Sequence, residues 1–492
     1  MATQPPSGDK PEATRQKQHS RLFMWIDRRT GLDKLLHEAL DEPIPGGARL
    51  AYIFGSGLLF IFISQVITGI FLALYYVPSV SAAHESTAYI AKMVAAGSFL
   101  LSLHVYGAYA MVIILLVHLG QTFTYGSYKG RRELLWVCGT ILFVLVMGMA
   151  FTGYLLPWSQ KSYFATAVGT SVPNEIPVIG GFIEKLMRGG TQIGQLTLSR
   201  FYAMHVFYIP ALIFLFVAIH IYLFRKAGAA GPVSESPVKP KQKTESFYPR
   251  QLVMDLIFTV CLVTALGFFA YFDPAGLGPL ANPADTNYLP RPDWYFRPLF
   301  EWLKLFHGNY EILRIIIIPT IIAILFVGLP FIDRRLERRP WRRPVAMGIF
   351  SLVFIALVSL GAYSYHQDAT NKDVATQLAQ QHKMEVQFMK EPFKPLMAGG
   401  AATAQSSKAS GPLVAEGKKI FQSHMCSACH GEGAVGTPVA PRLIGIGQKF
   451  STPQMEHLFK HPLPAMDKGG MPHFTFTPDQ VKAIRSYLDS LQ

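Results

Sequence analysis

The sequence predicts an all-α membrane protein in which a bundle of seven transmembrane helices is followed by a small helical soluble domain. Half of the 492 residues are hydrophobic and only 15% are charged, whereas soluble domains carry about 25% charged residues. Seven apolar segments reach the length of about 20 residues that a helix needs to cross a bilayer. Residues 412–492 contain no such segment and are expected to fold outside the membrane.

The apolar segments divide the chain into five parts. The predicted spans are residues 50–77, 95–123, 134–156, 203–224, 252–271, 311–332 and 345–364. The predicted parts are a polar tail (1–30), a four-helix core (31–230), a three-helix part (231–365), a linker (366–411) and a soluble domain (412–492). The tail lacks the apolar core of a secretory signal, and the linker is assigned from its small and polar residues, as in AGGAATAQSSKASG.

The net charge of +14 is concentrated in short loops between the apolar segments. Basic clusters occupy residues 129–132, 239–243 and 334–343, and seven passes place all three on one side of the membrane. Basic loops stay on the cytoplasmic side. We therefore expect a multi-pass protein of the cell inner membrane, with a cytoplasmic N-terminus and a periplasmic soluble domain. The same distribution favours an anionic membrane surface over nucleic acid as the reason for the charge.

Four histidines lie inside predicted spans, where an unpaired imidazole is costly. His104 and His118 are 14 residues apart in the second span, and His205 and His220 are 15 apart in the fourth. Such spacings are close to four turns, or about 21 Å along a helix. The two spans run parallel, so His104 pairs in depth with His205, and His118 with His220. One such histidine could be an ordinary interhelical residue, but four at matched depths indicate two bis-histidine haem sites.

Glycines in the first and third predicted spans repeat the same period. Gly55 and Gly69 are 14 residues apart, as are Gly139 and Gly153. Glycine lets a bulky group approach a helix backbone closely. Ordinary helix packing is the alternative, and the period shared with the histidines favours haem contact.

The soluble domain contains the C-x-x-C-H signature of covalent haem attachment, formed by Cys426, Cys429 and His430. A zinc site would need two further ligands, and no second cysteine pair exists. Helical segments before the motif and at the C-terminus are typical of a small class I c-type cytochrome. Met471 is the expected sixth ligand of this haem c, with Met466 as the competitor.

Residues 30–365 resemble the cytochrome b family of quinol–cytochrome c reductases and their photosynthetic relatives. The resemblance is carried by GYLLPW at 153–158, IPVIGGFIEKLMRGG at 176–190 and RPDWYFRPLF at 291–300, together with the four histidines. It implies two haem b groups held by those histidines and a quinol or quinone substrate.

The resemblance also implies a quinol-oxidising site at Pro292, Asp293, Trp294 and Tyr295, where the family has Pro-Glu-Trp-Tyr. Quinol oxidation releases protons, so the site needs a base, and Asp293 has the required chemistry. Tyr154 and Tyr295 would line the pocket. Turn formation is the alternative role for a loop aspartate. The shorter acid is compatible with a low-potential quinone such as menaquinone.

On the other side of the membrane, the resemblance places Arg225 and Asp255 at a quinone-reducing site. A carboxylate serving the N-terminus of a helix is the alternative for Asp255. The family often has arginines near the second-span histidines, where this chain has Leu101 and Gly120. Arg200 and the basic loop at 129–132 would then pair with the haem propionates.

These features together imply a quinol:cytochrome c oxidoreductase subunit that bifurcates the electrons of quinol and couples the reaction to proton translocation. One electron would pass to a separate Rieske iron–sulfur protein and then through the c haem to a c-type cytochrome acceptor, and the other would cross the membrane to the quinone pool. A homodimeric complex is expected from the resemblance. A dihaem anchor for a dehydrogenase and a non-catalytic electron conduit are the rival functions.

Overall fold

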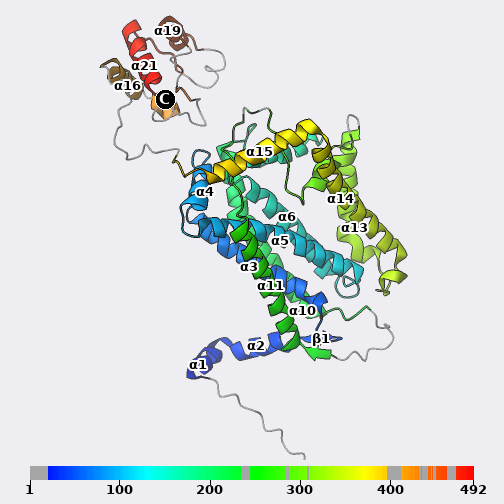
Figure 1. Ribbon diagram of the computed structural model, residues 1–492. Coiled ribbons are helices and arrows are strands. Elements are labelled where there is room, and N and C mark those ends of the chain that lie inside the picture. Colours follow the sequence, from blue (N-terminus) through cyan, green and yellow to red (C-terminus); the bar gives the residue numbers. More distant parts are fainter. Residues whose placement is uncertain are drawn as a thin grey trace, which may run out of the picture.

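The structure is a computed structural model that describes residues 20–233, 244–283, 285, 287–306, 310–395, 412–424, 426–430, 434, 442–444, 446, 450–462 and 472–491. Seven helices among these residues are long and apolar enough to cross a membrane. They form an elongated bundle in which α3, α5, α6, α10 and α11 run side by side (Figure 1). The predicted fold class is thereby confirmed.

The spans agree with the predicted segments, with small shifts at their ends. They are η1 (Leu50–Tyr52) with α3 (Ile53–Ala73), α5 (Gly97–Thr124), α6 (Glu133–Tyr154), α9 (Gln195–Ala203) with η3 (Met204–Tyr208) and α10 (Ile209–Ala227), α11 (Arg250–Phe272), η5 (Leu313–Ile317) with α13 (Ile318–Ile332), and α14 (Pro344–Thr370). The fourth span begins at Gln195 instead of 203, because polar residues continue the helix beyond its apolar part.

Two spans contain a π-helical turn, and both turns have the same cause. η3 and η5 each precede a proline at the second position of the next α-helix, Pro210 and Pro319. Proline has no N–H to donate, so the regular i to i−4 bond is lost there, and the turn before it widens. π-turns are frequent at functional sites, and η3 contains His205.

The centre of the bundle is a four-helix core. Phe62 of α3, Leu115 of α5, Val146 of α6 and Ile213 of α10 are buried against one another. Apolar side chains on one face of each helix therefore meet at the middle of the bundle, which fixes the relative depth of α5 and α10.

Short elements gather at the two ends of the bundle (Figure 1). One end has α4 (Ala83–Lys92), α7 (Gln160–Ser171), η2 (Val172–Glu175), α8 (Gly180–Arg188), α12 (Arg297–Trp302) and α15 (Lys372–Lys390). The other end has α1 (Arg21–Thr30), α2 (Leu32–Leu40), η6 (Pro340–Arg342) and the antiparallel strands β1 (Pro43–Pro45) and β2 (Thr244–Ser246).

Helix α15 lies inside the range predicted as a linker. Asn371 caps it by accepting hydrogen bonds from the backbone of Asp373 and Val374. Lys92 of α4 donates to the carbonyls of Phe388 and Glu391, which holds the far end of α15 against α4. Small polar residues predicted a linker, and the amphipathic pattern of 372–390 was missed.

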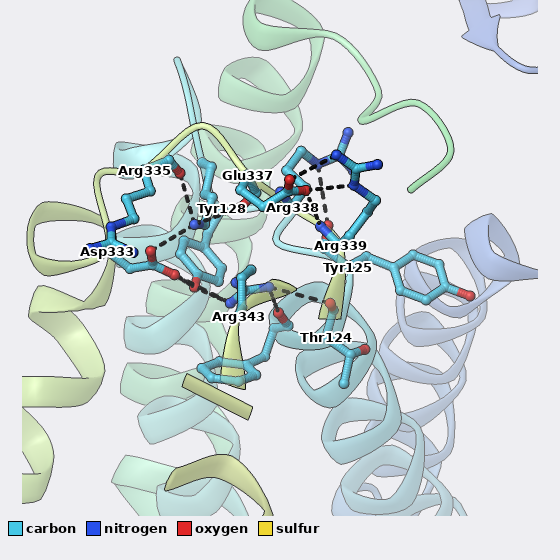
Figure 2. A network of polar contacts seen from close by, with 11 residues as sticks. Thr124, Tyr125, Tyr128, Asp333, Arg335, Glu337, Arg338, Arg339 and Arg343 are labelled. Carbon is cyan, nitrogen blue, oxygen red and sulfur yellow. Dashed lines mark hydrogen bonds and ion pairs between the residues drawn. The ribbon is translucent and has the colours of Figure 1, made fainter. Parts of the chain in front are cut away.

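The basic loops predicted to share one side of the membrane are joined by a polar network (Figure 2). Lys129, in the loop after α5, bonds to Asp333 and to the carbonyls of Arg335 and Glu337 after α13. Arg338 bonds to the carbonyl of Gly231, in the loop after α10. The described parts of all three loops are therefore at the same end of the bundle, and the basic cluster at 239–243 lies outside the described residues.

The C-terminal domain is built from α16 (Pro412–Ser423), α17 (Cys426–His430), α19 (Thr452–Lys460) and α21 (Pro478–Ser490). Its core includes Phe421, Met455 and Val481. Gly417 of α16 lets α21 approach closely, since a Cβ there would lie 2.0 Å from the carbonyl oxygen of Ala483. The first and last helices of the domain thus pack directly together.

Candidate functional site

His104 of α5 and His205 of η3 face each other, as their matched depth predicted. The centroids of the two rings are 6.1 Å apart, at an interplanar angle of 75°. The Nδ1 of His104 lies 3.0 Å from the hydroxyl of Thr68, and the Nδ1 of His205 lies 3.1 Å from the carbonyl oxygen of Met149. With Nδ1 engaged on each ring, Nε2 is left for a ligand bond.

His118 and His220 line one large cavity, about 1110 Å³ in volume, at the end of the bundle where the basic loops lie. The Nδ1 atoms of both are buried and have no hydrogen-bond partner among the described residues. Buried polar atoms are normally bonded. Two buried imidazoles that line a cavity of this size fit a ligand held between the two rings.

Each of the four predicted glycines lies against one of these imidazoles. A Cβ at Gly69 would be 3.3 Å from Cε1 of His104, and one at Gly153 would be 2.6 Å from Cε1 of His205. The corresponding distances are 3.9 Å from Gly55 to His118 and 3.3 Å from Gly139 to His220. A larger residue at Gly69, Gly139 or Gly153 would crowd its imidazole, whereas a Cβ at Gly55 would make an ordinary contact. The four imidazoles and the glycine cradles therefore fit two haem groups, with His104 and His205 holding one and His118 and His220 the other.

Arg225 and Asp255 line the same cavity as His118 and His220. Asp255 is buried, and its Oδ1 accepts a hydrogen bond of 2.8 Å from Nε2 of Gln251. It lies in the second turn of α11, beyond the first turn where the helix dipole acts on a carboxylate. A polar acid and a cation thus face the cavity next to one histidine pair.

At the opposite end, the segment Pro292-Asp293-Trp294-Tyr295 lies beside the end of α6. The hydroxyl of Tyr154, the last residue of α6, is buried and has no hydrogen-bond partner among the described residues. The ring of Tyr295 lies 6.0 Å from that of Tyr109 on α5. Burial, and then the charge of Asp293, raises the pKa of the Tyr295 hydroxyl. Tyr295 is therefore a neutral hydrogen-bonding group beside Asp293.

Lys161 is the functional residue that the sequence reasoning missed. Its Nζ lies 2.9 Å from Oδ1 of Asp293. Burial alone would lower the pKa of Lys161, but the carboxylate of Asp293 raises it above its ordinary value. Lys161 is the third residue after GYLLPW, so its nearness to the tyrosine pocket was a signal that could have identified it.

Arg200 has another contact in this structure. Its guanidinium donates to the carbonyls of Lys185 and Leu186, at the end of α8. These two bonds satisfy carbonyl groups at the end of a helix, and they account for the position of Arg200 without a haem. The role of Arg200 toward a propionate stays a prediction.

The attachment motif in the C-terminal domain forms its own short helix. Cys426 packs against the domain core, and His430 ends α17 one turn later. Two thiols and an imidazole in one turn are the donor set that a covalent haem requires. Met471, Met466 and the side chain of Cys429 lie outside the described residues.

Three segments of the chain match known families. Residues 39–228 match "Cytochrome b/b6/petB", residues 280–382 match "Cytochrome b(C-terminal)/b6/petD", and residues 412–488 match "Cytochrome C oxidase, cbb3-type, subunit III". The first two segments contain the four membrane histidines and Asp293, and the third contains the attachment motif.

Curated relatives cover the membrane part. The "Cytochrome bc complex cytochrome b subunit" of Chlorobaculum thiosulfatiphilum is 34% identical over 318 residues, which are 64% of this chain and 74% of the relative. The "Cytochrome b/c1" of Bradyrhizobium diazoefficiens is 32% identical over 69% of this chain and 50% of the relative. The "Menaquinol:cytochrome c reductase cytochrome b subunit" of Geobacillus thermodenitrificans is 36% identical over 44% of this chain and 99% of the relative.

A solved structure has the same fold. A chain of the "Hyperthermophilic respiratory Complex III" aligns with a TM-score of 0.64 at 25% identity, covering 74% of this chain and 96% of that chain.

Proposed function

The chain belongs to the cytochrome b family, with a c-type cytochrome domain at its C-terminus, and from this premise we propose that it bifurcates the electrons of quinol between two routes. The resemblance found in the sequence is thereby confirmed. The protein is an integral membrane subunit of a bc-type quinol:cytochrome c reductase, which is an oxidoreductase that contains haem. The two routes, the partners and the proton translocation are the proposal.

One observation supports the proposal most. Polar sites lie at both ends of the bundle, and each adjoins one histidine pair. Tyr154 of the Asp293 site follows Gly153, the glycine against His205. Asp255 and Arg225 share a cavity with His118 and His220. A protein with one quinone site would need only one such polar end, which disfavours the rival role of dehydrogenase anchor.

At the Asp293 end, the residues of the chain bind quinol and accept its proton. Asp293 is the base, because a carboxylate within hydrogen-bond reach of a quinol hydroxyl takes the proton as the electrons leave. The hydroxyl of Tyr154, which has no hydrogen-bond partner in the described part of the chain, supplies a hydrogen bond to the quinol. Haem groups between the histidine pairs would supply one-electron carriers at two depths, and haem on Cys426 and Cys429 would supply a third.

At the other end, Arg225 and Asp255 serve quinone reduction. The cation attracts the reduced ring, and the acid gives it a proton. Release of protons at the Asp293 end and uptake at the Asp255 end would move protons across the membrane.

The partners follow from the same scheme. The first electron goes to a separate Rieske iron–sulfur protein and then through the c-type domain, in its predicted range 412–492, to a c-type cytochrome acceptor. We propose menaquinol as the substrate, which the shortened acid at Asp293 and the relative named menaquinol:cytochrome c reductase support. A homodimeric complex, the inner membrane as its location and a periplasmic Asp293 end complete the proposal.

Purification with the native partners tests it. Pyridine haemochrome analysis should give two b haems to each c haem, and the preparation should contain an iron–sulfur subunit and reduce added cytochrome c with quinol. Asp293→Asn should lower this activity about 100-fold or more with the haem content unchanged. A single b haem, or full turnover by D293N, would contradict the proposal. Haem reduction by a dehydrogenase without quinol oxidation would favour the anchor function instead.

A further inference from the structure

Lys161 and Asp293 form an ion pair at the edge of the Tyr154 pocket. The Lys161 side chain is 39% exposed and that of Asp293 is 15% exposed. The carboxylate is thus nearly enclosed, and the ammonium reaches it from the outer side. Lys161 is the second residue of α7, so the helix holds its backbone firmly beside the pocket.

Tyrosines cover the carboxylate on its other sides. The side chain of Tyr109, on α5, lies near Asp293, and its ring is 6.0 Å from that of Tyr295. The groups that face the carboxylate are Lys161 of α7, Tyr109 of α5, Tyr154 of α6 and Tyr295 of its own loop. Only one of the four carries a charge, and that charge is the ammonium of Lys161.

The Lys161 ammonium has a different environment on the side away from Asp293. A small cavity of about 200 Å³ lies there, and its lining includes Lys161, Tyr288 and, from α15, Glu385. The groups that face the ammonium are Asp293, Glu385, Tyr109, Tyr288 and the ring of Tyr154, whose centroid is 5.6 Å from Nζ. Burial and then Glu385 raise the pKa of Tyr288 to about 12, so Tyr288 stays neutral beside the cavity.

We propose that Lys161 is a positioning residue for quinol oxidation, which holds the Asp293 carboxylate by their ion pair and places it as the proton acceptor between the quinol pocket and the small cavity under α15. This inference rests on the proposed function. A cation within about 4 Å of a carboxylate favours its ionised form. When the quinol O–H bond breaks, the proton bonds to Asp293 and the electrons leave by the two proposed routes. Neutral Asp293 then no longer pairs with Lys161, which opens a way for the proton toward the cavity.

The pH profile of quinol oxidation by the assembled complex tests the inference. In Lys161→Met the carboxylate loses its cation and becomes harder to ionise. Because the base must be ionised, the acidic limb of kcat should move to higher pH by about 1–3 units. Lys161→Arg keeps the charge and should restore the profile. Lys185→Met removes an exposed lysine from α8 at the same end of the bundle and should leave the profile unchanged.

The outcomes separate the inference from the proposed function. A K161M profile that overlays the wild type, in an enzyme that D293N inactivates, overturns the role of Lys161 and leaves the function intact. Full turnover by D293N overturns the base itself. If K161M lacks its haem complement, the comparison uses Lys161→Gln instead. This variant keeps a hydrogen-bonding group without the charge. An unshifted limb in K161Q likewise overturns the inference.

Discussion

The Nζ atom of Lys129 lies 2.7 Å from Oδ1 of Asp333, and this ion pair joins the loop after α5 to the loop after α13. The Lys129 side chain is only 4% exposed. The other carboxylate oxygen, Oδ2, accepts a hydrogen bond of 2.6 Å from the hydroxyl of Tyr128 and lies 3.3 Å from Arg343. Two helices far apart in the sequence are therefore held together by a partly buried carboxylate, both of whose oxygens have polar partners.

Removal of the ammonium should destabilise the protein. Lys129→Met leaves the carbonyls of Arg335 and Glu337 without their donor, and breaking a buried pair costs about 3–5 kcal/mol. We expect the lower end, about 3 kcal/mol, because Arg343 still faces Asp333. A thermal unfolding scan in detergent measures the change. Lys34→Met, which breaks the exposed pair with Glu38, is the control and should cost less than about 1 kcal/mol. Equal losses of stability in the two variants would refute the argument.

The same contact predicts how stability depends on pH. Burial raises the pKa of Asp333, but the hydrogen bonds from Lys129 and Tyr128 outweigh burial, and the net pKa lies below the ordinary value of 3.8. A lowered carboxyl pKa stabilises the folded state above the unfolded pKa. That stabilisation should be lost as pH falls below 3.8, and Asp333→Asn should flatten this part of a plot of Tm against pH. A plot of unchanged slope would contradict the assignment.

Gly153 should be needed for only one of the two histidine pairs. In Gly153→Ala the new Cβ would lie 2.6 Å from Cε1 of His205, so the ring must turn away from His104. We expect one of the two b haems to be lost and the other to remain, as measured by pyridine haemochrome analysis. Gly148→Ala in the same helix meets its nearest neighbour, Ile209, at an ordinary 3.7 Å and should keep both haems. Equal haem content in the two variants would show that Gly153 is not part of a cradle.

The sequence predicts the spans and the histidine pairs because both depend on patterns that one helix carries by itself. Apolar length fixes a span, and a spacing of 14 places His104 and His118 on one helix face at two different depths. Lys161 and Glu385 escaped prediction, since each acquires its role from residues more than 100 positions away. The partner of Asp293 depends on how α7 packs against a later loop, and periodicity contains no information on that contact.

Asp255 should control quinone reduction without affecting the Asp293 site. Asp255→Asn keeps the hydrogen bond to Gln251 but removes the proton donor, so reduction of quinone should slow about 100-fold. Stopped-flow assays with one end of the bundle inhibited at a time separate the two reactions. Asp255→Glu should recover most of the rate. A carboxylate that only served the helix dipole would leave the rate in D255N unchanged.

Gly417 should be required for the C-terminal domain alone. In Gly417→Ala the Cβ would lie 2.0 Å from the backbone oxygen of Ala483, and a backbone atom cannot move aside as a side chain can. Helices α16 and α21 must then separate, at a cost of about 1–3 kcal/mol, and the attachment motif loses the core that Cys426 packs against. Covalent haem on a denaturing gel should fall while the b haem content stays constant. Lys418→Ala, at the exposed neighbouring position, is the control and should retain both the covalent haem and the b haems. A joint loss of b and c haem in G417A would mean that the membrane part and the C-terminal domain do not fold independently.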